Sequence, residues 1–360
     1  REGLDGSDQR GGIWKDAPDA TFAAVSPTPG VTQIGLHILY VYIQMNHLEC
    51  VTAQRNQWYW YLLILFLSFL ISNTLGTIPY MAVLVWNILR SGGLQNMPEV
   101  LSGGNLSFLT EGIDSNLMLF VMLFAFVILL VAGAYLIQQL QGRTWRMVVN
   151  GTQRVRWSHF FGGFAVWGVI NVISMAVGYV TDPGNFEFRF DAARFIPLVL
   201  VAVTMIPIQS ASEEFFFRGY LAQGVASWTG SRWWALVVPS VLFGLMHAAN
   251  PEVAQYGFWV MMPQYILMGV AFGLAALLDD GIEVAMGAHA ANNLCGALLT
   301  TYEGAAIQTD ALFMVRELNP MADLPELILS GALFVGILAY LYKWQFGVLR
   351  RPVPPPFKYV

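Results

Sequence analysis

The residues best suited to chemistry lie in SASEEFFFRGY, residues 210–220, where three charged side chains interrupt an apolar stretch. The preceding residues 195–209 carry no charge. A charge at the centre of a bilayer costs roughly 2.5–3.5 kcal/mol on insertion scales, so such side chains normally face a protein interior or a wet cavity with partners. On a helix, Glu214 and Arg218 are four residues apart and can pair. Glu213 is rotated about 100° from Glu214 and therefore needs a partner on another element.

Two further polar clusters lie within apolar stretches of the chain. FGLMH ends at His247, and HAANN runs from His289 to Asn293. His289 and Asn293 are four residues apart, so on a helix both can face the same cavity. Together with the acidic pair, three helices supply two glutamates, two histidines and an asparagine.

This combination of groups favours hydrolysis. An ionised Glu213 can remove a proton from water, and neutral His247 can hold the same water by a ring nitrogen. The negative charge that develops on a carbonyl oxygen needs donors already in place, which the imidazole of His289 and the amide of Asn293 would supply. Glu214 would position these groups, while the arginine of the same helix would offset the charge of the two carboxylates.

Each feature taken alone also has a structural interpretation. A Glu–Arg pair on one helix often serves only stability, and a histidine near a helix end often caps the helix or lies at the interface. Asn292 or Asn293 could hydrogen-bond between helices, which is worth ~0.6–2 kcal/mol in membranes. It is the combination of the three clusters in one chain that indicates catalysis.

The same three clusters carry a resemblance to a known family. EEFFFR, FGLMH and HAANN match, in this order, the EExxxR, FxxxH and HxxxN motifs of the CPBP family. That family comprises the CAAX prenyl endopeptidases (type II CAAX proteases, among them CAAX prenyl protease 2) and bacterial bacteriocin-processing or immunity proteins. The resemblance covers roughly residues 158–300 and implies an intramembrane endopeptidase of eight helices.

The resemblance also implies a set of catalytic positions. They are Glu213, Glu214, Arg218, His247, His289 and Asn293. Glu213 resembles the catalytic glutamate, and His247 resembles the residue that helps it to activate water. The histidine and the asparagine of the third motif resemble a pair that stabilises the oxyanion. The substrate implied is a membrane-associated protein or peptide, of the CAAX type or of the bacteriocin or immunity type.

A metal ion is the least determined part of this interpretation. Glu213, His247 and His289 could bind Zn²⁺ and leave one position open for water. However, the chain has no HExxH sequence, and an amide beside His289 suits an oxyanion hole better than a zinc shell. We therefore expect no metal or other cofactor, with zinc as the alternative.

Two functions of other classes remain open. A transporter could use the same buried glutamates, histidines and arginine as a proton relay, and a non-catalytic immunity or scaffold protein could bind a partner through the same helices. Other intramembrane proteases are disfavoured, because the chain lacks the HExxH of site-2 proteases and a GxSG-like serine motif. Asp279 and Asp280 lie in a turn without a GxGD-like sequence.

Membrane helices must position these residues. Of the 360 residues, 56% are hydrophobic and 11% are charged, against ~25% charged in soluble domains. The sequence therefore predicts an all-α, polytopic membrane protein with a catalytic cavity inside the helix bundle. About eight apolar stretches are expected to cross the ~30 Å hydrocarbon core. They are residues 58–89, 117–138, 159–180, 195–225, 233–247, 258–278, 282–299 and 327–344.

The chain divides into four predicted segments. They are a polar leader with an interfacial helix (1–56), N-terminal membrane helices (57–157), the protease-like core (158–300), and an extracytoplasmic loop, last helix and cytoplasmic tail (301–360). Residues 139–158 contain four arginines and no acid, so the positive-inside rule places this loop and both termini in the cytoplasm. The cavity is expected to open on that side. A net charge of −5 gives no reason to expect nucleic-acid binding, which leaves the substrate and the lipid bilayer as the partners.

Overall fold

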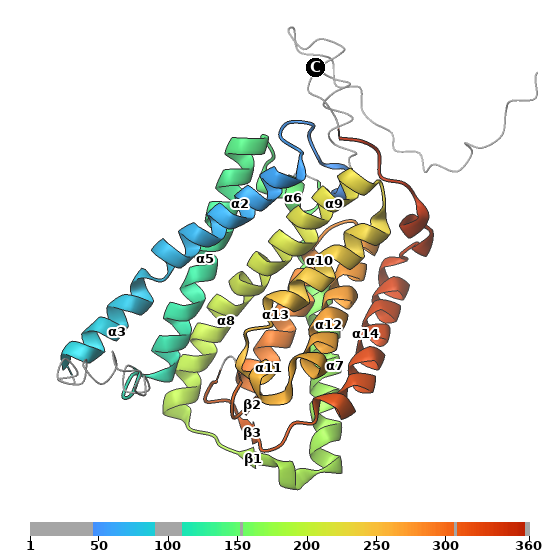
Figure 1. Ribbon diagram of the computed structural model, residues 1–360. Coiled ribbons are helices and arrows are strands. Elements are labelled where there is room, and N and C mark those ends of the chain that lie inside the picture. The colour runs from blue at the N-terminus through green and yellow to red at the C-terminus, as the bar shows by residue number, and fades with distance from the viewer. Residues whose placement is uncertain (1–45, 91–109, 152–153, 306–307, 357–360) are drawn as a thin grey trace, which may run out of the picture. The chain divides into compact units, whose positions relative to one another are not determined.

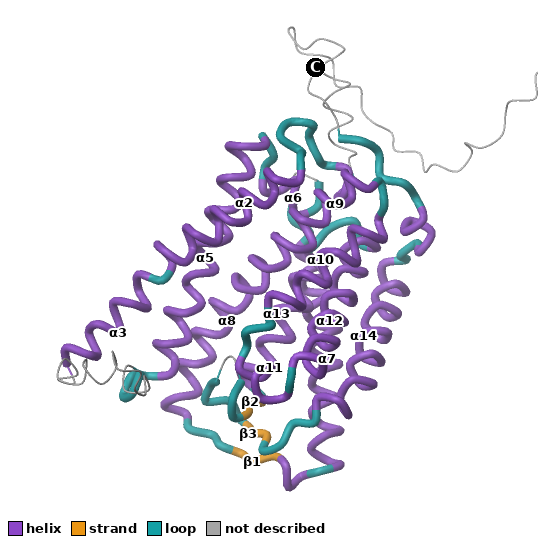
Figure 2. Tube along the Cα trace, viewed as in Figure 1, coloured by secondary structure: helices purple, strands orange, loops and turns teal. Residues whose placement is uncertain are grey.

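The computed structural model describes residues 46–90, 110–151, 154–305 and 308–356. Helices account for nearly all of the regular structure in these residues (Figure 2). The prediction of an all-α, polytopic membrane fold is thereby confirmed. Most of the predicted leader and of its interfacial helix lies outside the described residues.

Figure 1 shows the main helices in their order along the chain. They are α2 (Trp58–Ile71), α3 (Ile78–Arg90), α5 (Ser115–Gln141), α7 (Trp157–Thr181), α8 (Ala192–Glu214), α9 (Ala222–Thr229), α10 (Arg232–Met246), α12 (Phe258–Leu278), α13 (Glu283–Leu298) and α14 (Pro320–Tyr342). The shorter elements are η1 (His47–Glu49), η2 (Ser72–Gly76), α6 (Trp145–Val149), η5 (Pro183–Asn185), η6 (Phe215–Leu221), α11 (Pro251–Tyr256), η7 (Phe346–Arg350) and three strands.

The number of helices able to cross a membrane differs from the expected eight. Among the described residues, six helical stretches are long and apolar enough: Trp58–Arg90, Ser115–Gln141, Trp157–Thr181, Ala192–Thr229, Phe258–Leu278 and Pro320–Tyr342. The other two expected spans form α10 and α13, of 15 and 16 residues. At about 1.5 Å per residue these helices are roughly 22 and 24 Å long, shorter than the ~30 Å hydrocarbon core. The two short helices are the ones that carry the second and third motifs.

The first expected span is interrupted in the turn before Pro79, where a proline is expected to disturb a helix, because its ring clashes with the carbonyl group four residues earlier. The break is the π-helical turn η2, and α3 begins at Ile78. Because proline has no N–H and is tolerated in the first turn of a helix, Pro79 helps to start α3. The hydroxyl of Ser72 donates to the carbonyl oxygen of Ala125 in α5 at 2.6 Å, which fixes the break against the neighbouring helix.

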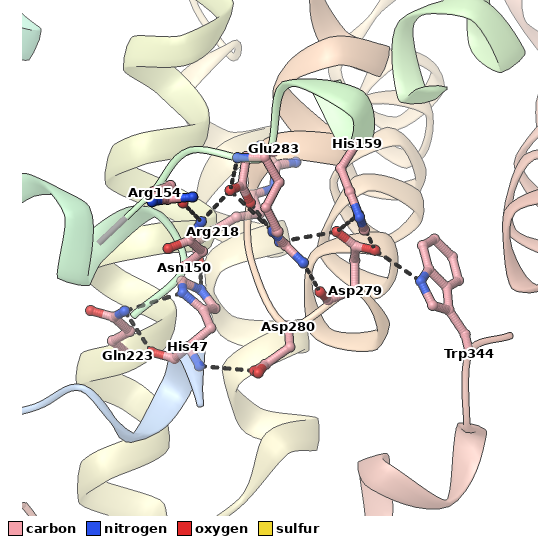
Figure 3. Close-up of polar contacts among 11 residues, drawn as sticks. His47, Asn150, Arg154, His159, Arg218, Gln223, Asp279, Asp280, Glu283 and Trp344 are labelled. Carbon is pink, nitrogen blue, oxygen red and sulfur yellow. Dashed lines mark hydrogen bonds and ion pairs between the residues drawn. The ribbon is translucent and has the colours of Figure 1, made fainter. Parts of the chain in front are cut away.

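A cluster of charged side chains holds together the loops at one end of the helices. This turn cluster consists of Asp279, Glu283, Arg156 and His159 (Figure 3). Arg156 lies 3.1 Å from Asp279 and 2.6 Å from Glu283, and His159 Nδ1 lies 2.9 Å from Asp279. The indole N–H of Trp344 donates to Asp279 at 3.0 Å. The arginine-rich loop, the α12–α13 turn and the segment after α14 therefore meet at one end, as the predicted alternation of spans requires.

The α7–α8 and α13–α14 connections and the start of α5 meet at the opposite end. The hydroxyl of Ser115 donates to Asp310 at 2.6 Å, and the Asn185 amide donates to the carbonyl oxygen of Glu317 at 2.9 Å. Here β1 (Phe186–Phe188) pairs antiparallel with β3 (Phe313–Val315), which pairs parallel with β2 (Thr300–Tyr302). The sequence did not predict these strands. Which end faces the cytoplasm stays a prediction.

Close backbone contact between α7 and α13 positions the third motif. A Cβ atom at Gly287 of α13 would collide with the carbonyl oxygen of Phe160, and one at Gly163 of α7 would collide with that of Val284. Small residues permit this approach in membranes, where van der Waals packing drives helix association. The contact places one face of α13 against α7. α13 also packs against α8, which carries the first motif.

Candidate active site

The first motif lies where a long helix changes its geometry. α8 ends at Glu214 and continues without interruption as the π-helix η6, which contains Arg218, and then as α9. π-helical segments are rare in proteins, and those that occur often lie at functional sites. The wider turn leaves the carbonyl oxygen of Arg218 to accept from His47 Nε2 at 3.0 Å. His47 belongs to η1 and is buried, so the N-terminal segment stabilises the motif helix.

Glu214 is fully buried and held by two partners. Its Oε1 accepts from Arg218 Nη1 at 2.7 Å and from His289 Nδ1 at 2.7 Å. Because an ionised carboxylate only accepts hydrogen bonds, Nδ1 is the nitrogen of His289 that carries a proton. Arg218 also donates to the carbonyl oxygen of Gly269 at 3.3 Å and lies 4.2 Å above the ring of Phe243. Glu214 therefore fixes the orientation of His289 and is poorly placed to act as a base.

Glu213, like Glu214, has one oxygen without a hydrogen-bond partner among the described residues, and it differs from Glu214 in being partly exposed. Its Oε1 accepts from Gln209 Nε2 at 2.6 Å. Its Oε2 finds no hydrogen-bond partner among the described residues, and His289 Nε2 lies 3.7 Å away. The Glu213 side chain is 15% exposed, whereas that of Glu214 is 0% exposed. Glu213 thus combines a firmly held carboxylate with a free oxygen, as a general base requires.

Asn293 reaches Glu213 through a residue that the sequence did not single out. Asn293 Nδ2 donates to Gln209 Oε1 at 2.9 Å, and the amide of Gln209 donates to Glu213. Gln209 is uncharged and precedes the motif, so it carried no signal of its own. Its spacing of four residues from Glu213 would have placed both on one helix face.

His247 is the sequence-predicted residue that stands apart. Its Nδ1 donates to the carbonyl oxygen of Phe243 at 2.8 Å, and its ring stacks on Tyr265 at 4.4 Å. The ring of Phe243 contacts both His247, at 4.7 Å, and His289, at 5.8 Å. Within the described part of the chain, no hydrogen bond or ion pair is found between His247 and the other five predicted residues. The structure thus brings five of the six into one hydrogen-bonded and ion-paired group, with His247 across one aromatic ring.

The side chains that could bind zinc do not converge. Among the residues that the structure describes, no three His, Cys, Asp or Glu side chains lie close enough together to hold a metal ion. The set considered from the sequence, Glu213, His247 and His289, is divided by the separation of His247. The residues as placed therefore do not fit a zinc site.

A cavity of about 570 Å³ lies beside this group. Its walls include residues of all three strands, so it lies at the end of the helices opposite the turn cluster. Trp167 and Asn292 line it, whereas the six predicted catalytic residues do not. This cavity therefore differs from the predicted catalytic cavity both in its lining and in the end at which it lies.

Comparison with known proteins identifies the region that carries the three motifs. Residues 193–295 match the family model described as type II CAAX prenyl endopeptidase Rce1-like. This stretch runs from the start of α8 into α13 and contains all six predicted catalytic residues. The chain thus carries an Rce1-like domain, in agreement with the resemblance to the CPBP family.

A relative of uncharacterised function resembles a larger part of the chain. The chain is 26% identical over 294 residues to the uncharacterized protein YyaK of Bacillus subtilis (strain 168), which covers 81% of this chain and 94% of that protein. No solved structure matches the chain. The helices describe a multi-pass membrane protein, and the comparisons show that residues 193–295 are similar to type II CAAX prenyl endopeptidases.

Proposed function

We propose that this protein is an intramembrane endopeptidase that hydrolyses a peptide bond in a membrane-associated protein or peptide. One observation carries the proposal: inside an Rce1-like domain, the buried carboxylate of Glu213 has one oxygen held by Gln209 and the other without a hydrogen-bond partner among the described residues. A carboxylate arranged in this way can accept a proton from water without first breaking a hydrogen bond.

In the proposed reaction, Glu213 is the general base. Its Oε2 removes a proton from a water molecule, whose oxygen then attacks the carbonyl carbon of the scissile peptide bond. When the tetrahedral intermediate collapses, the proton passes from Glu213 to the leaving amine nitrogen. Water is consumed, a carboxylate and an amine are released, and Glu213 returns to its ionised form.

His289 and Asn293 would stabilise the charge on the carbonyl oxygen. With Nδ1 bonded to Glu214, an imidazolium His289 has its Nε2–H directed toward Glu213, and the 3.7 Å separation is too long for a hydrogen bond. This N–H can therefore be donated to a carbonyl oxygen that enters the gap. The Asn293 amide has two N–H donors and gives one to Gln209, so the second can serve the same oxygen.

His247 would hold the attacking water. The carbonyl oxygen of Phe243 can only accept, so Nδ1 of His247 carries the proton and Nε2 is the acceptor in the neutral ring. The separation of His247 from Glu213 means that a water or substrate must complete this side of the site. No metal is used in this mechanism.

The substrate class follows from the family alone. A prenylated CAAX protein would meet the description of the matching family model, and the resemblance to the CPBP family adds a small membrane-associated peptide of the bacteriocin or immunity type as the alternative. Both termini of the protein are proposed to face the cytoplasm, with the substrate reaching the helix bundle from that side.

Terminal-peptide proteomics tests the function without a known substrate. Membranes would contain the wild type, Glu213→Gln or the control Glu187→Gln, whose carboxylate is exposed in β1 and far from the motif in sequence. We expect new peptide termini with the wild type and Glu187→Gln and none with Glu213→Gln at matched folded abundance. Identical termini in all three samples, with a prenylated reporter peptide also uncut, would contradict the proposal and favour a transporter or a scaffold.

A further inference from the structure

Four hydrogen bonds form a continuous chain that ends on Glu213. Trp167 Nε1 donates to Asn292 Oδ1 at 3.1 Å, and Asn292 Nδ2 donates to Asn293 Oδ1 at 3.1 Å. Asn293 Nδ2 then donates to Gln209 Oε1 at 2.9 Å, and Gln209 Nε2 donates to Glu213 Oε1 at 2.6 Å. This series of hydrogen bonds crosses from α7 through α13 to α8. Glu213, at its end, is its one charged member.

The direction of this chain is fixed by its two ends. An indole nitrogen can only donate, so the amide of Asn292 must turn its oxygen toward Trp167. An ionised carboxylate can only accept, so the amide of Gln209 must turn its nitrogen toward Glu213. The three amides between these ends have one arrangement that satisfies both. Reversing any of them would set two donors or two acceptors against each other.

We propose that Gln209 is a positioning residue that donates to Oε1 of the Glu213 carboxylate and so commits this oxygen, which leaves Oε2 to receive the incoming proton. A hydrogen bond to an ionised acceptor is roughly twice as strong as one between neutral groups, so donation by Gln209 favours the carboxylate form. Because Oε1 is occupied, the proton adds to the oxygen that faces His289 Nε2.

Gln209 also sets the orientation of Asn293. Its Oε1 accepts from Asn293 at 2.9 Å and from the hydroxyl of Ser210 at 3.2 Å, so this oxygen cannot turn toward Glu213. Gln209 is 6% exposed, which shields these bonds from competition with water. One side chain therefore links the base to a donor of the proposed oxyanion site. Its effect on the rate rests on the proposed function, whereas its effect on the protonation of Glu213 does not.

Infrared titration of the full-length protein in lipid nanodiscs tests the proposal directly. The carbonyl band of protonated Glu213 is identified by its absence in Glu213→Gln, and its midpoint is followed against pH. We expect Gln209→Met, which keeps the size of the side chain, to move the midpoint upward by about one pH unit. Trp167→Phe removes the N–H at the start of the series together with part of the buried ring, and it should move the midpoint in the same direction by less.

Two further variants make the result specific. Gln264→Met is the matched control, because Gln264 donates to the carbonyl oxygen of Pro320 at 2.7 Å and lies on α12; its midpoint should equal that of the wild type. Gln209→Glu keeps an acceptor for Asn293 but replaces the donor with a like charge, so it should raise the midpoint more than Gln209→Met. Gln209→Glu also serves if Gln209→Met fails to fold.

The outcomes separate this inference from the proposed function. An unchanged midpoint in both Gln209 variants, or an equal shift in Gln264→Met, would overturn it. A lower cleavage rate at every pH without a shifted midpoint would reduce Gln209 to a structural role and overturn it as well. If the midpoint shifts as expected but the wild type cleaves no substrate, the positioning role stands and the proposed function fails. If the wild type is active, the acid limb of its pH–rate profile should move with the infrared midpoint.

Discussion

Two clusters of the same composition lie within this protein and differ in how completely they are satisfied. The motif cluster consists of Glu213, Glu214, Arg218 and His289, and the turn cluster of Asp279, Glu283, Arg156 and His159. Each contains two carboxylates, one guanidinium and one imidazole. The two clusters therefore contain the same kinds of charged groups and differ in the hydrogen-bond partners of those groups.

In the turn cluster, every carboxylate oxygen has a donor. Asp279 accepts from His159, Arg156 and Trp344, and Glu283 accepts from Arg156 through both oxygens. The Asn150 amide also donates to Glu283 (Figure 3). Buried carboxylates with complete sets of donors stabilise the structure and are not available to a substrate. The turn cluster is thus a structural joint between three segments.

In the motif cluster, the donors are incomplete. Among the described residues, Oε2 of Glu213, Oε2 of Glu214 and Nε of Arg218 have no hydrogen-bond partner. Leaving a buried polar atom unpaired costs about 1–3 kcal/mol or more, so such atoms are expected where a substrate or water completes the set. The difference between the clusters supports the proposal that the motif cluster is the one that performs chemistry.

The largest effect is expected for Glu213→Gln. Loss of the general base should lower the cleavage rate by about 10³-fold, within the range of 10²–10⁴ for such groups. Stability should change little, because the amide keeps an oxygen for Gln209. The cleavage rate is measured on a substrate found by terminal proteomics, and the free energy of unfolding in mixed micelles. A rate within a few-fold of the wild type would remove the distinction between the clusters.

Glu283→Gln should have the opposite pattern. Removing one partner of a buried ion pair typically costs about 3–5 kcal/mol, and Arg156 would keep Asp279 as a carboxylate partner, so we expect a loss near the lower end of this range. The carboxylate is 0% exposed and accepts from Arg156 at 2.6 Å, so water cannot replace it readily. Unfolding in mixed micelles measures the loss, and the rate per folded molecule should stay near that of the wild type. A stable but inactive Glu283→Gln protein would refute the structural assignment.

His47 connects the motif helix to the α12–α13 turn and makes stability depend on pH. Its Nε2 donates to the carbonyl oxygen of Arg218, and its backbone N–H donates to Asp280 at 2.8 Å. Burial lowers the pKa of His47 from 6.5 to about 4. The unfolded chain therefore binds this proton first as the pH falls. The resulting stability is present above pH 6.5 and is lost between about pH 6.5 and 4.

The variant His47→Gln isolates this contribution. Wild type should lose on the order of 3 kcal/mol more than His47→Gln across this pH interval, whereas a glutamine can still donate to the Arg218 carbonyl oxygen. Unfolding in mixed micelles at several pH values measures the difference. If the free energy of unfolding depended on pH in the same way in both proteins, protonation of His47 would not contribute to the pH dependence of stability.

The sequence predicted the motif cluster better than the turn cluster, for a physical reason. The spacing of four residues places Glu214 and Arg218 within reach on any helix, so their 2.7 Å pair needed no tertiary information. By contrast, Asp279 meets His159 across 120 residues, and helix register across that interval is not encoded locally. A charge in an apolar stretch is conspicuous in sequence, whereas the uncharged Gln209 is not.

The positions of the helices along the chain were likewise predictable from the sequence, but their lengths were not. Apolar stretches located all eight expected helices, but their lengths within the bundle depend on neighbours. α10, which keeps an exposed face, and α13, which is largely buried, end after 15 and 16 residues, and apolar composition alone could not indicate these lengths. The π-helical segment η6 and the three strands also depend on partners far along the chain. The position of His247 across Phe243 has the same origin.

The smallest effect is expected for Trp344→Phe in the turn cluster. The variant removes the N–H that donates to Asp279 at 3.0 Å but leaves Arg156 and His159 in place, so the loss should be about 1–2 kcal/mol. Burial raises the pKa of Asp279 despite these partners, and losing a donor should raise it further. The loss of stability is therefore full at neutral pH and shrinks as acidification protonates Asp279 in both proteins.

Unfolding at pH 7 and pH 4 measures this loss of stability. Trp233→Phe, which changes an exposed tryptophan, is the control. A loss equal at both pH values would mean that Trp344 acts by packing alone, and the complete set of donors would then not be what separates the turn cluster from the motif cluster.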